Sequence, residues 1–378
     1  MTLGKVLRRF GLTLLIAVVF TVGAALLTIN NVVHGPSQTV RDMLIRAAIQ
    51  ASATKWVPGL FFDEELINSV MTAETQTETI AIADLIPPTP RPTQMPQDVS
   101  AVAEVPESTP EPDPWENAPD DMRLEIYNGS TFKGYILLVK DPARVYTGKC
   151  RSTFAYGAYG DQIFSLIDRG EAIAATNAGG FDDPGGHGGG GTPLGLTYSG
   201  GECLWDDGSD LTFIGFDSDN RLVAENHMTR AQADALGIRD AVSFQTNKVL
   251  INRVDGEVTA YYADSDTSLA QRTAIGQAAD GTVILMVTEG RTSAYLGANR
   301  EDIINAMLEY GAVTAAMLDG GSSAMLCYPG YYDNYEVDET QLNKFQRQGL
   351  VNSYRAFTPP RAMPTFWAVK PLDGGNAG

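Results

Sequence analysis

The chain has 378 residues, of which 44% are hydrophobic and 19% are charged, a composition typical of a globular protein. The formal net charge of −19 argues against a nucleic-acid partner, because a phosphate backbone attracts basic surfaces. The three cysteines, Cys150, Cys203 and Cys327, form no C-x-x-C pair or Cys/His cluster. A zinc site is therefore not expected, and nothing in the sequence selects a disulfide pair.

The N-terminus predicts a membrane anchor. Lys5, Arg8 and Arg9 precede an apolar run over residues 10–29, about the length that crosses a bilayer as a helix. The basic cluster precedes the run, so residues 1–9 are expected in the cytoplasm and the rest outside the cell. A cleaved signal peptide is the alternative, but the run lacks a small-x-small exit, which favours an uncleaved helix over residues 10–33.

Two connecting segments follow the expected anchor. Residues 34–86 show a mainly helical pattern, with Val40, Met43, Leu44 and Ala47 on one face, and are expected to form a membrane-proximal stalk. Residues 87–120 are rich in proline and acidic residues without periodicity, which is typical of a disordered linker. The functional domain is therefore expected to span residues 121–378, a comfortable size for one core.

Short apolar strands dominate this domain. Residues 135–139 and 283–288 are expected strands, and residues 211–216 and 221–223 form an expected hairpin around an acidic turn. Helical patterns cover residues 163–169 and 300–310, and Gly311 is a natural stop for the second. The predicted fold class is α+β, with a mixed, largely antiparallel β-sheet and packed helices.

The most informative motif is at residues 316–325, where an apolar run ends in Asp319 and is followed by Gly320, Gly321, Ser322 and Ser323. Glycines let the backbone turn and approach a ligand closely. A buried carboxylate costs several kcal/mol unless it is paired or used. The alternative is an ordinary Asp-Gly turn between two strands.

A glycine-rich stretch at residues 176–195 is the second landmark. It has no Lys-Ser/Thr of a Walker loop, and Pro193 stands where a dinucleotide fingerprint requires a helix. An esterase triad is excluded in its usual order, because all three histidines precede Ser322. His187 is therefore expected in a loop near a ligand or in solvent.

The third landmark is a predicted hairpin that begins near Arg272 and Thr273 and ends at Glu289, Gly290 and Arg291. Arginine side chains bind phosphate oxygens in a bidentate manner, so these two are candidate phosphate ligands. Surface arginines at strand ends are the alternative.

Together these motifs resemble the phosphodiester glycosidase family. The resemblance rests on NAGGF at residues 177–181, RTAIG at 272–276, EGR at 289–291 and LDGGSS at 318–323, in the family's order. Glu289 stands where an aspartate is more usual, and Ser322 replaces the third glycine of many members. The resemblance implies hydrolysis of a sugar-1-phosphodiester of the N-acetylglucosamine-1-phosphodiester type, in a cell-surface or extracellular glycan.

The expected site follows from chemistry at the anomeric carbon, where phosphate is a good leaving group once its charge is neutralised. The catalytic candidates are Asp319, as nucleophile or base, its partner Glu289, and Arg272. The expected substrate-binding residues are Asn177, Gly179, Gly180, Asp182, His187, Thr273, Arg291, Gly320, Gly321, Ser322 and Ser323.

Two alternatives remain open from the sequence. One is a noncatalytic cell-surface glycan-binding module involved in exopolysaccharide assembly, which would use the same arginines and tolerate loss of Asp319. The other is a metal-dependent phosphodiesterase using Asp182, Asp183 and Asp319. No cofactor is expected, although calcium or magnesium held by oxygen atoms stays open. The expected partners are the glycan substrate and, through the N-terminal helix, the membrane.

Overall fold

A computed structural model describes residues 56–71, 75–80, 113–184, 189–254, 256–263, 268–334, 342–353 and 359–372, with isolated residues between 13 and 49. The chain divides into two compact units. The first comprises residues 1–74 and 264–268, and the second comprises residues 75–263 and 269–378. In the first unit, a 3-10 turn, η1 (Pro58–Leu60), precedes helix α3 (Glu64–Met71), where Asp63 accepts a hydrogen bond from the Leu66 amide at 2.7 Å.

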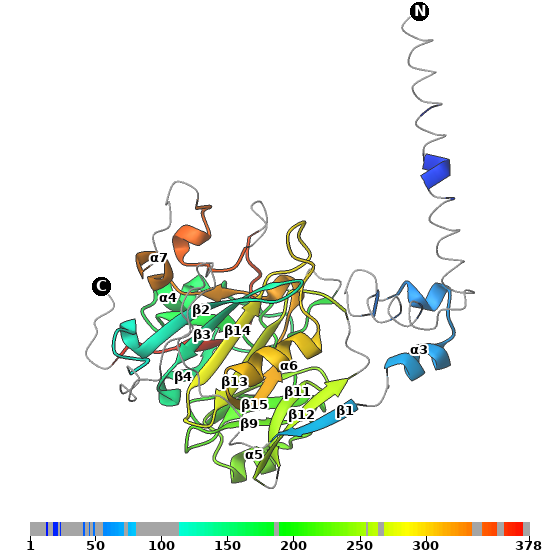
Figure 1. Cartoon of the computed structure of the whole chain (residues 1–378). Helices are drawn as coiled ribbons and strands as arrows, with labels where there is room; N and C mark the ends of the chain where they lie inside the picture. Colours follow the sequence, from blue (N-terminus) through cyan, green and yellow to red (C-terminus); the bar gives the residue numbers. More distant parts are fainter. Residues whose placement is uncertain are drawn as a thin grey trace, which may run out of the picture. The chain divides into compact units, whose positions relative to one another are not determined.

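An eight-stranded antiparallel sheet is the centre of the second unit, in the order β1-β12-β11-β15-β13-β14-β3-β2. Figure 1 shows these strands side by side, with helix α6 (Arg300–Glu309) lying across one face. The strands are β1 (Thr75–Ile80), β2 (Met122–Asn128), β3 (Lys133–Val139), β11 (Val249–Val254), β12 (Glu257–Ala263), β13 (Thr273–Ala278), β14 (Val283–Thr288) and β15 (Ala312–Met317).

Two smaller antiparallel sheets complete the unit. A five-stranded sheet has the order β7 (Glu202–Trp205), β6 (Thr197–Ser199), β10 (Asp240–Phe244), β8 (Thr212–Phe216) and β9 (Leu222–Glu225). A four-stranded sheet has the order β16 (Leu326–Cys327), β5 (Ala174–Asn177), β17 (Thr365–Val369) and β4 (Val145–Lys149). The other helices are short: α4 (Phe164–Asp168), α5 (Arg230–Ala235) and α7 (Gly330–Asn334).

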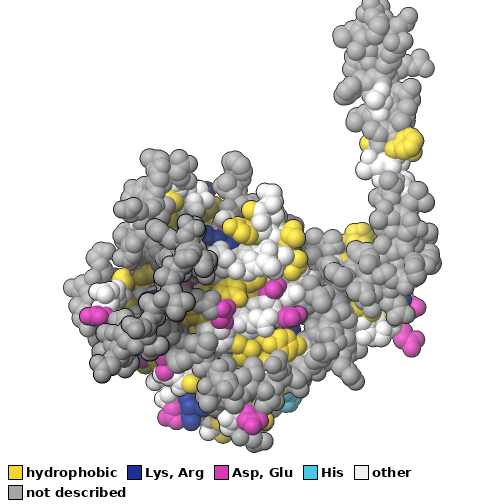
Figure 2. Space-filling model, in the orientation of Figure 1, with side chains coloured by type: hydrophobic (Ala, Val, Ile, Leu, Met, Phe, Trp, Pro, Cys, Tyr) yellow, Lys and Arg dark blue, Asp and Glu magenta, His cyan; other side chains and the backbone are white. Residues whose placement is uncertain are grey.

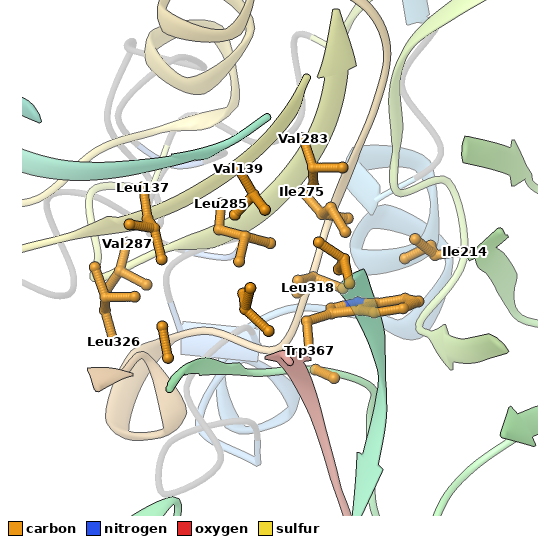
Figure 3. Packing of buried hydrophobic residues seen from close by; sticks show 14 of the residues in the cluster. Leu137, Val139, Ile214, Ile275, Val283, Leu285, Val287, Leu318, Leu326 and Trp367 are labelled. Atoms are coloured by element: carbon orange, nitrogen blue, oxygen red, sulfur yellow. The ribbon is translucent and has the colours of Figure 1, made fainter. Parts of the chain in front are cut away.

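One hydrophobic core joins these sheets. Figure 3 shows Leu137 and Leu285 of the large sheet facing Trp367 of β17, with Leu318 between them. All four are fully buried. Alternate residues of β13 and β14 point the other way, into a second cluster under α6. The central strands are therefore buried on both faces, which explains the unbroken apolar run at the start of β14.

The predicted fold, a largely antiparallel sheet with packed helices, is confirmed. Several of the expected strands and helices are also present. The hairpin at residues 211–223 is β8 paired with β9, and α6 begins and ends within one residue of its expected bounds. Asn299 and Asp302 form a capping box at the start of α6, and Gly311 has φ +76° just after it.

Strand β1 differs from the sequence expectation. Residues 75–80 fall in the segment predicted as a helical stalk, but their backbone pairs with β12 at the edge of the large sheet. The run TQTETI contains three threonines, and β-branched residues favour a strand over a helix. The apolar helical pattern earlier in the stalk carries no information about these residues.

Most of the expected anchor, most of the stalk before residue 56, residues 72–74 and residues 81–112 lie outside the described residues. The described residues of the anchor are Thr13, residues 18–21 and Gly23, and all of them are helical. No helix in the described part of the chain combines the length and apolar character needed to cross a bilayer. On the face drawn in Figure 2, the acidic side chains stand at separated positions rather than in one patch.

Candidate active site

The three predicted catalytic residues lie where four neighbouring strands end. Strands β15, β13, β14 and β3 are adjacent and antiparallel, so the C-terminal ends of β15 and β14 lie beside the N-terminal ends of β13 and β3. Asp319 follows β15, Arg272 precedes β13, and Glu289 follows β14. Adjacent strands lie about 4.8 Å apart, so these backbones fall within about 10 Å of each other.

Asp319 is a recessed carboxylate that follows β15. Its backbone N–H donates to the Ala178 carbonyl at 3.2 Å, which ties it to the end of β5. Burial raises the pKa of Asp319 to about 6, opposed by hydrogen bonds from the Ser323 hydroxyl and the Gly320 backbone amide. Among the described residues, no lysine or arginine forms an ion pair with it. Such a carboxyl group changes its charge near neutral pH, which suits proton transfer or nucleophilic attack.

Asn177 holds the Asp319 backbone in place. Its amide nitrogen donates to the Asp319 carbonyl, and its amide oxygen accepts from the Thr273 hydroxyl at 2.8 Å and the Met325 amide at 3.1 Å. Asn177 and Thr273 are both fully buried. Both are substrate-binding candidates from the sequence; in the structure both side chains are buried, and Asn177 bonds the Asp319 backbone.

Gly320 lets the Asp319 segment lie against the start of β13. A Cβ at Gly320 would stand 2.9 Å from the Gln271 carbonyl oxygen and 3.6 Å from the Cα of Arg272. Hydrogen bonds hold the segment on both sides of this contact. The Leu318 amide donates to the Thr273 carbonyl at 2.8 Å, and the Gly321 amide donates to the Gln271 carbonyl at 2.9 Å. Asp319 and Arg272 are thereby fixed as neighbours across the two strands.

Glu289 is a second buried carboxyl group, 3% exposed. Its Oε1 accepts from the Ser353 backbone amide at 2.6 Å. Burial raises the pKa of Glu289, and hydrogen bonds from Ser353 and the Tyr135 hydroxyl, together with the charge of Lys133, oppose this rise. The fully engaged carboxyl group is less open to a substrate than Asp319 is.

Arg272 and Arg291 form a pair of like charges. The Arg272 Nε donates to the Ala298 carbonyl at 3.1 Å, which orients its guanidinium group. Burial lowers the pKa of Arg291, and the positive charge of Arg272 lowers it further. Arg291 also adopts a left-handed backbone conformation with φ +54°. Two guanidinium groups that repel each other are stabilised by a bound anion, and arginine binds phosphate oxygens well.

A third arginine, Arg361, joins the site from the C-terminal segment. Its Nη1 donates to the Ser323 hydroxyl at 3.1 Å and approaches the Ser322 hydroxyl at 3.4 Å. Its Nη2 pairs with Asp183, and its guanidinium carbon lies 4.8 Å from the centre of the Phe181 ring. Ser323, which also bonds Asp319, therefore stands between the carboxylate and this arginine.

The glycines of the second landmark serve close backbone packing. A Cβ at Gly179 would lie 2.9 Å from the Ser243 carbonyl oxygen, and the Gly180 amide donates to that oxygen at 2.8 Å. A Cβ at Gly190 would lie 2.0 Å from the Ala362 carbonyl oxygen. Asp182 is exposed, and His187 lies outside the described residues. The sequence predicts that Gly179 and Gly180 bind substrate. In the structure their backbone packs against Ser243.

Neither metal nor disulfide chemistry is indicated by the described residues. They contain no group of three or more His, Cys, Asp or Glu side chains placed to hold a metal ion. All three cysteines are unpaired, and Cys150 and Cys327 are buried.

Comparison with known protein families matches residues 170–370, more than half of the 378-residue chain, to the phosphodiester glycosidase family. The chain belongs to this family. The matched region contains Asn177, Arg272, Glu289, Asp319 and Arg361.

Solved structures with a related fold include the zebrafish N-acetylglucosamine-1-phosphodiester alpha-N-acetylglucosaminidase catalytic domain, auto-inhibited by its pro-peptide. The match has a TM-score of 0.50 at 17% identity and covers 68% of this chain and 85% of the zebrafish chain. It supports the phosphodiester glycosidase fold. A hypothetical protein from Synechocystis matches with a TM-score of 0.40 at 14% identity, covering 67% of this chain and 62% of the other.

Among curated proteins, the SPbeta prophage-derived uncharacterized protein YomE of Bacillus subtilis (strain 168) is 36% identical over 63 residues. That stretch is 17% of this chain and 10% of YomE, so the chain spans only a tenth of that relative's length.

The structure of this phosphodiester glycosidase adds residues to the site expected from the sequence. Strand order brings Asp319, Arg272 and Glu289 to one end of the large sheet, with Arg291 near Arg272. Arg361, Ser353 and Tyr135 were not expected, because no glycine or motif marks them in the sequence. The run PRAMPTF around Arg361 gives no signal of its own, since only the fold brings it to Ser323.

Proposed function

We propose that this protein hydrolyses a sugar-1-phosphodiester of the N-acetylglucosamine-1-phosphodiester type, in a cell-surface or extracellular glycan. Family membership supports a glycosidase-type activity. The observation that carries the proposal is Asp319, a recessed carboxyl group whose pKa is raised to about 6, fixed beside Arg272 at the end of adjacent strands. Burying a carboxylate without a cationic partner costs stability, which is typical of a group retained for chemistry.

The proposed reaction breaks the bond between the anomeric carbon and the phosphodiester oxygen. That oxygen leaves with its electron pair as part of a phosphate monoester, and a water oxygen adds to the anomeric carbon to give free sugar. The leaving phosphate gains negative charge in the transition state. Arg272 and Arg291 would stabilise this charge, because they already form a positive pair that favours an anion.

Asp319 would act on the sugar side, either attacking the anomeric carbon or taking a proton from the attacking water. Glu289 is the second carboxyl group, and its raised pKa keeps a proton available at higher pH than an ordinary glutamate does. Ser322 is exposed beside Asp319 and would contact sugar hydroxyls. Arg361 would orient Ser323, and through it the Asp319 carboxylate.

The proposal also places the domain outside the cell on a single N-terminal anchor. This rests on Lys5, Arg8 and Arg9 followed by the apolar run at residues 10–29. Fusion of a reporter enzyme that works only outside the cytoplasm to residue 378 would give activity, whereas fusion to residue 9 would not. The reverse result would overturn this topology.

The reaction is tested with purified full-length protein and N-acetylglucosamine-α-1-phospho-6-mannoside, with product analysis. The proposal predicts N-acetylglucosamine and mannose 6-phosphate. N-acetylglucosamine-1-phosphate as the product would instead identify a phosphodiesterase. Absence of turnover on this and on related glucose and galactose phosphodiesters, together with measurable glycan binding, would identify a noncatalytic module.

A further inference from the structure

Two tyrosine rings are exposed on one short loop of the second unit. Tyr156 and Tyr159 are each 76% exposed. Among the described residues from 113 onward, they are the only aromatic side chains in the exposed class. The other aromatic residues of this part of the chain are buried or partly buried, as expected for side chains with so much apolar area. Tyr156 and Tyr159 are three positions apart in the sequence. Two exposed aromatic rings on one loop make it a candidate contact surface.

A ring contact and two hydrogen bonds fix the conformation of this loop. The Tyr156 ring packs edge-to-face against Trp205, with ring centres 5.3 Å apart and planes at 72°. The Thr192 hydroxyl donates to the Ala155 carbonyl at 2.6 Å and accepts from the Gly157 amide at 3.2 Å. A rigid aromatic surface loses little conformational entropy when a ligand binds.

Backbone contacts connect this loop to the segment that carries Arg361. Tyr159 forms a β-bridge with Gly190, and the Gly160 amide donates to the Gly189 carbonyl at 2.8 Å. Gly190 in turn packs on Ala362, the neighbour of Arg361, so closely that an added Cβ would lie 2.0 Å from the Ala362 carbonyl oxygen. The backbone of this loop is therefore connected, through Gly190, to the segment that carries Arg361.

We infer that Tyr156 and Tyr159 form a glycan-stacking subsite for pyranose residues beyond the hydrolysed phosphodiester. This inference rests on the proposed function, because it assigns the subsite to the same substrate. The flat ring of tyrosine covers the C–H face of a pyranose while its hydroxyl stays in water. The residues between and beside the tyrosines, Gly157, Ala158 and Gly160, supply no large apolar side chain. A protein partner would need a broader apolar centre than two rings provide.

Binding of glycans without a phosphodiester tests the subsite directly. The full-length protein is titrated calorimetrically with tetrasaccharides of N-acetylglucosamine, glucose, galactose and mannose, and with the four monosaccharides. At least one tetrasaccharide is expected to bind more tightly than its monosaccharide. The double substitution Tyr156→Ala and Tyr159→Ala should weaken binding of that tetrasaccharide about tenfold, which is about 1.4 kcal/mol.

Two matched variants separate stacking from other effects. Tyr156→Phe with Tyr159→Phe keeps both rings and should retain most of the affinity. Leu236→Ala, at an exposed apolar position on another element, should leave affinity unchanged. The inference is overturned if no tetrasaccharide binds more tightly than its monosaccharide, or if the double alanine variant binds as the wild type does. Equal weakening in the Leu236→Ala variant would also overturn it.

The two proposals fail in different ways. If the subsite is absent but the reaction is correct, the protein hydrolyses N-acetylglucosamine-α-1-phospho-6-mannoside without preferring longer glycans. If the reaction is wrong but the subsite exists, the protein does not hydrolyse the phosphodiester, yet the double alanine substitution still weakens tetrasaccharide binding.

Discussion

The side-chain amide of Asn177 donates a hydrogen bond to the backbone carbonyl oxygen of Asp319, 142 positions later in the chain. Asn177 ends β5 in the four-stranded sheet, and Asp319 follows β15 in the eight-stranded sheet. One buried side chain therefore sets the position of the proposed catalytic carboxylate where two sheets meet. The site depends on how these sheets pack, and not only on the loop that contains Asp319.

Replacement of Asn177 by alanine should affect both stability and catalysis. Asn177→Ala leaves the Thr273 hydroxyl, the Met325 amide and the Asp319 carbonyl without their partner, which should lower the free energy of unfolding by about 3 kcal/mol. Thr273→Val removes one of these bonds and should cost about 1–2 kcal/mol. Urea unfolding measures both. If Asn177→Ala retains full kcat/KM per folded molecule, its positioning role is wrong.

Two adjacent glycines give a paired test of the close approach to β13. Gly320→Ala should lower kcat/KM about 100-fold, because its Cβ would stand 2.9 Å from the Gln271 carbonyl oxygen and displace Asp319. Gly321→Ala has open space around its Cβ but φ +60°, so about 1 kcal/mol of strain and a fall of less than tenfold are expected. Steady-state kinetics of both variants provide the comparison. Equal losses in the two variants would contradict the geometric account.

Asp319 should make the native protein less stable as pH rises. Its folded pKa, about 6, is above the ordinary value of 3.8, so the native state holds the proton more tightly than the unfolded state does. Well below pH 3.8 both states are protonated and nothing is lost. Between pH 4 and 6 the native state loses up to about 3 kcal/mol relative to the unfolded state.

Asp319→Asn should therefore be about 1–3 kcal/mol more stable than the wild type at pH 7.5, with the difference vanishing near pH 4. Denaturant unfolding at the two pH values measures this. Asp219→Asn, at an exposed aspartate, serves as the control and should change stability by less than about 0.5 kcal/mol. A stability difference between Asp319→Asn and the wild type that is the same at both pH values would show that the carboxylate is not desolvated.

The pH dependence of the rate should report the same group. If Asp319 works as a carboxylate, kcat/KM rises with pH and levels off above a pKa of about 6. Ser323 donates a hydrogen bond that stabilises the carboxylate, so Ser323→Ala should move this limb to higher pH. Ser322→Ala, which removes a neighbouring hydroxyl, should leave the limb in place. A limb that does not move in Ser323→Ala would assign it to another group.

The sequence predicted the sheet-rich fold and the neighbourhood of Asp319, because strong local patterns encode both. The apolar runs of β14 and β15 end sharply at Glu289 and at the Asp-Gly-Gly turn, so strand ends and candidate carboxylates coincide in the sequence. Antiparallel pairing then brings Arg272 beside them.

Other features depend on long-range packing that the sequence does not encode locally. In the sequence, Asn177 begins a glycine-rich stretch, which suggests a ligand-binding residue. In the structure it is buried and donates a hydrogen bond to the Asp319 carbonyl. The glycine density around it reflects backbone contacts with Ser243 and Ala362, which are distant in sequence. Arg361 has no motif of its own and becomes a site residue only through Ser323 and Asp183.

The most direct test of the central claim is hydrolysis of N-acetylglucosamine-α-1-phospho-6-mannoside in ¹⁸O-labelled water by full-length wild-type protein and Asp319→Asn. The proposed mechanism predicts ¹⁸O in the released N-acetylglucosamine, none in mannose 6-phosphate, and a rate at least about 1,000-fold lower for Asp319→Asn. The label in the phosphate, or turnover by folded Asp319→Asn within tenfold of the wild type, would contradict it.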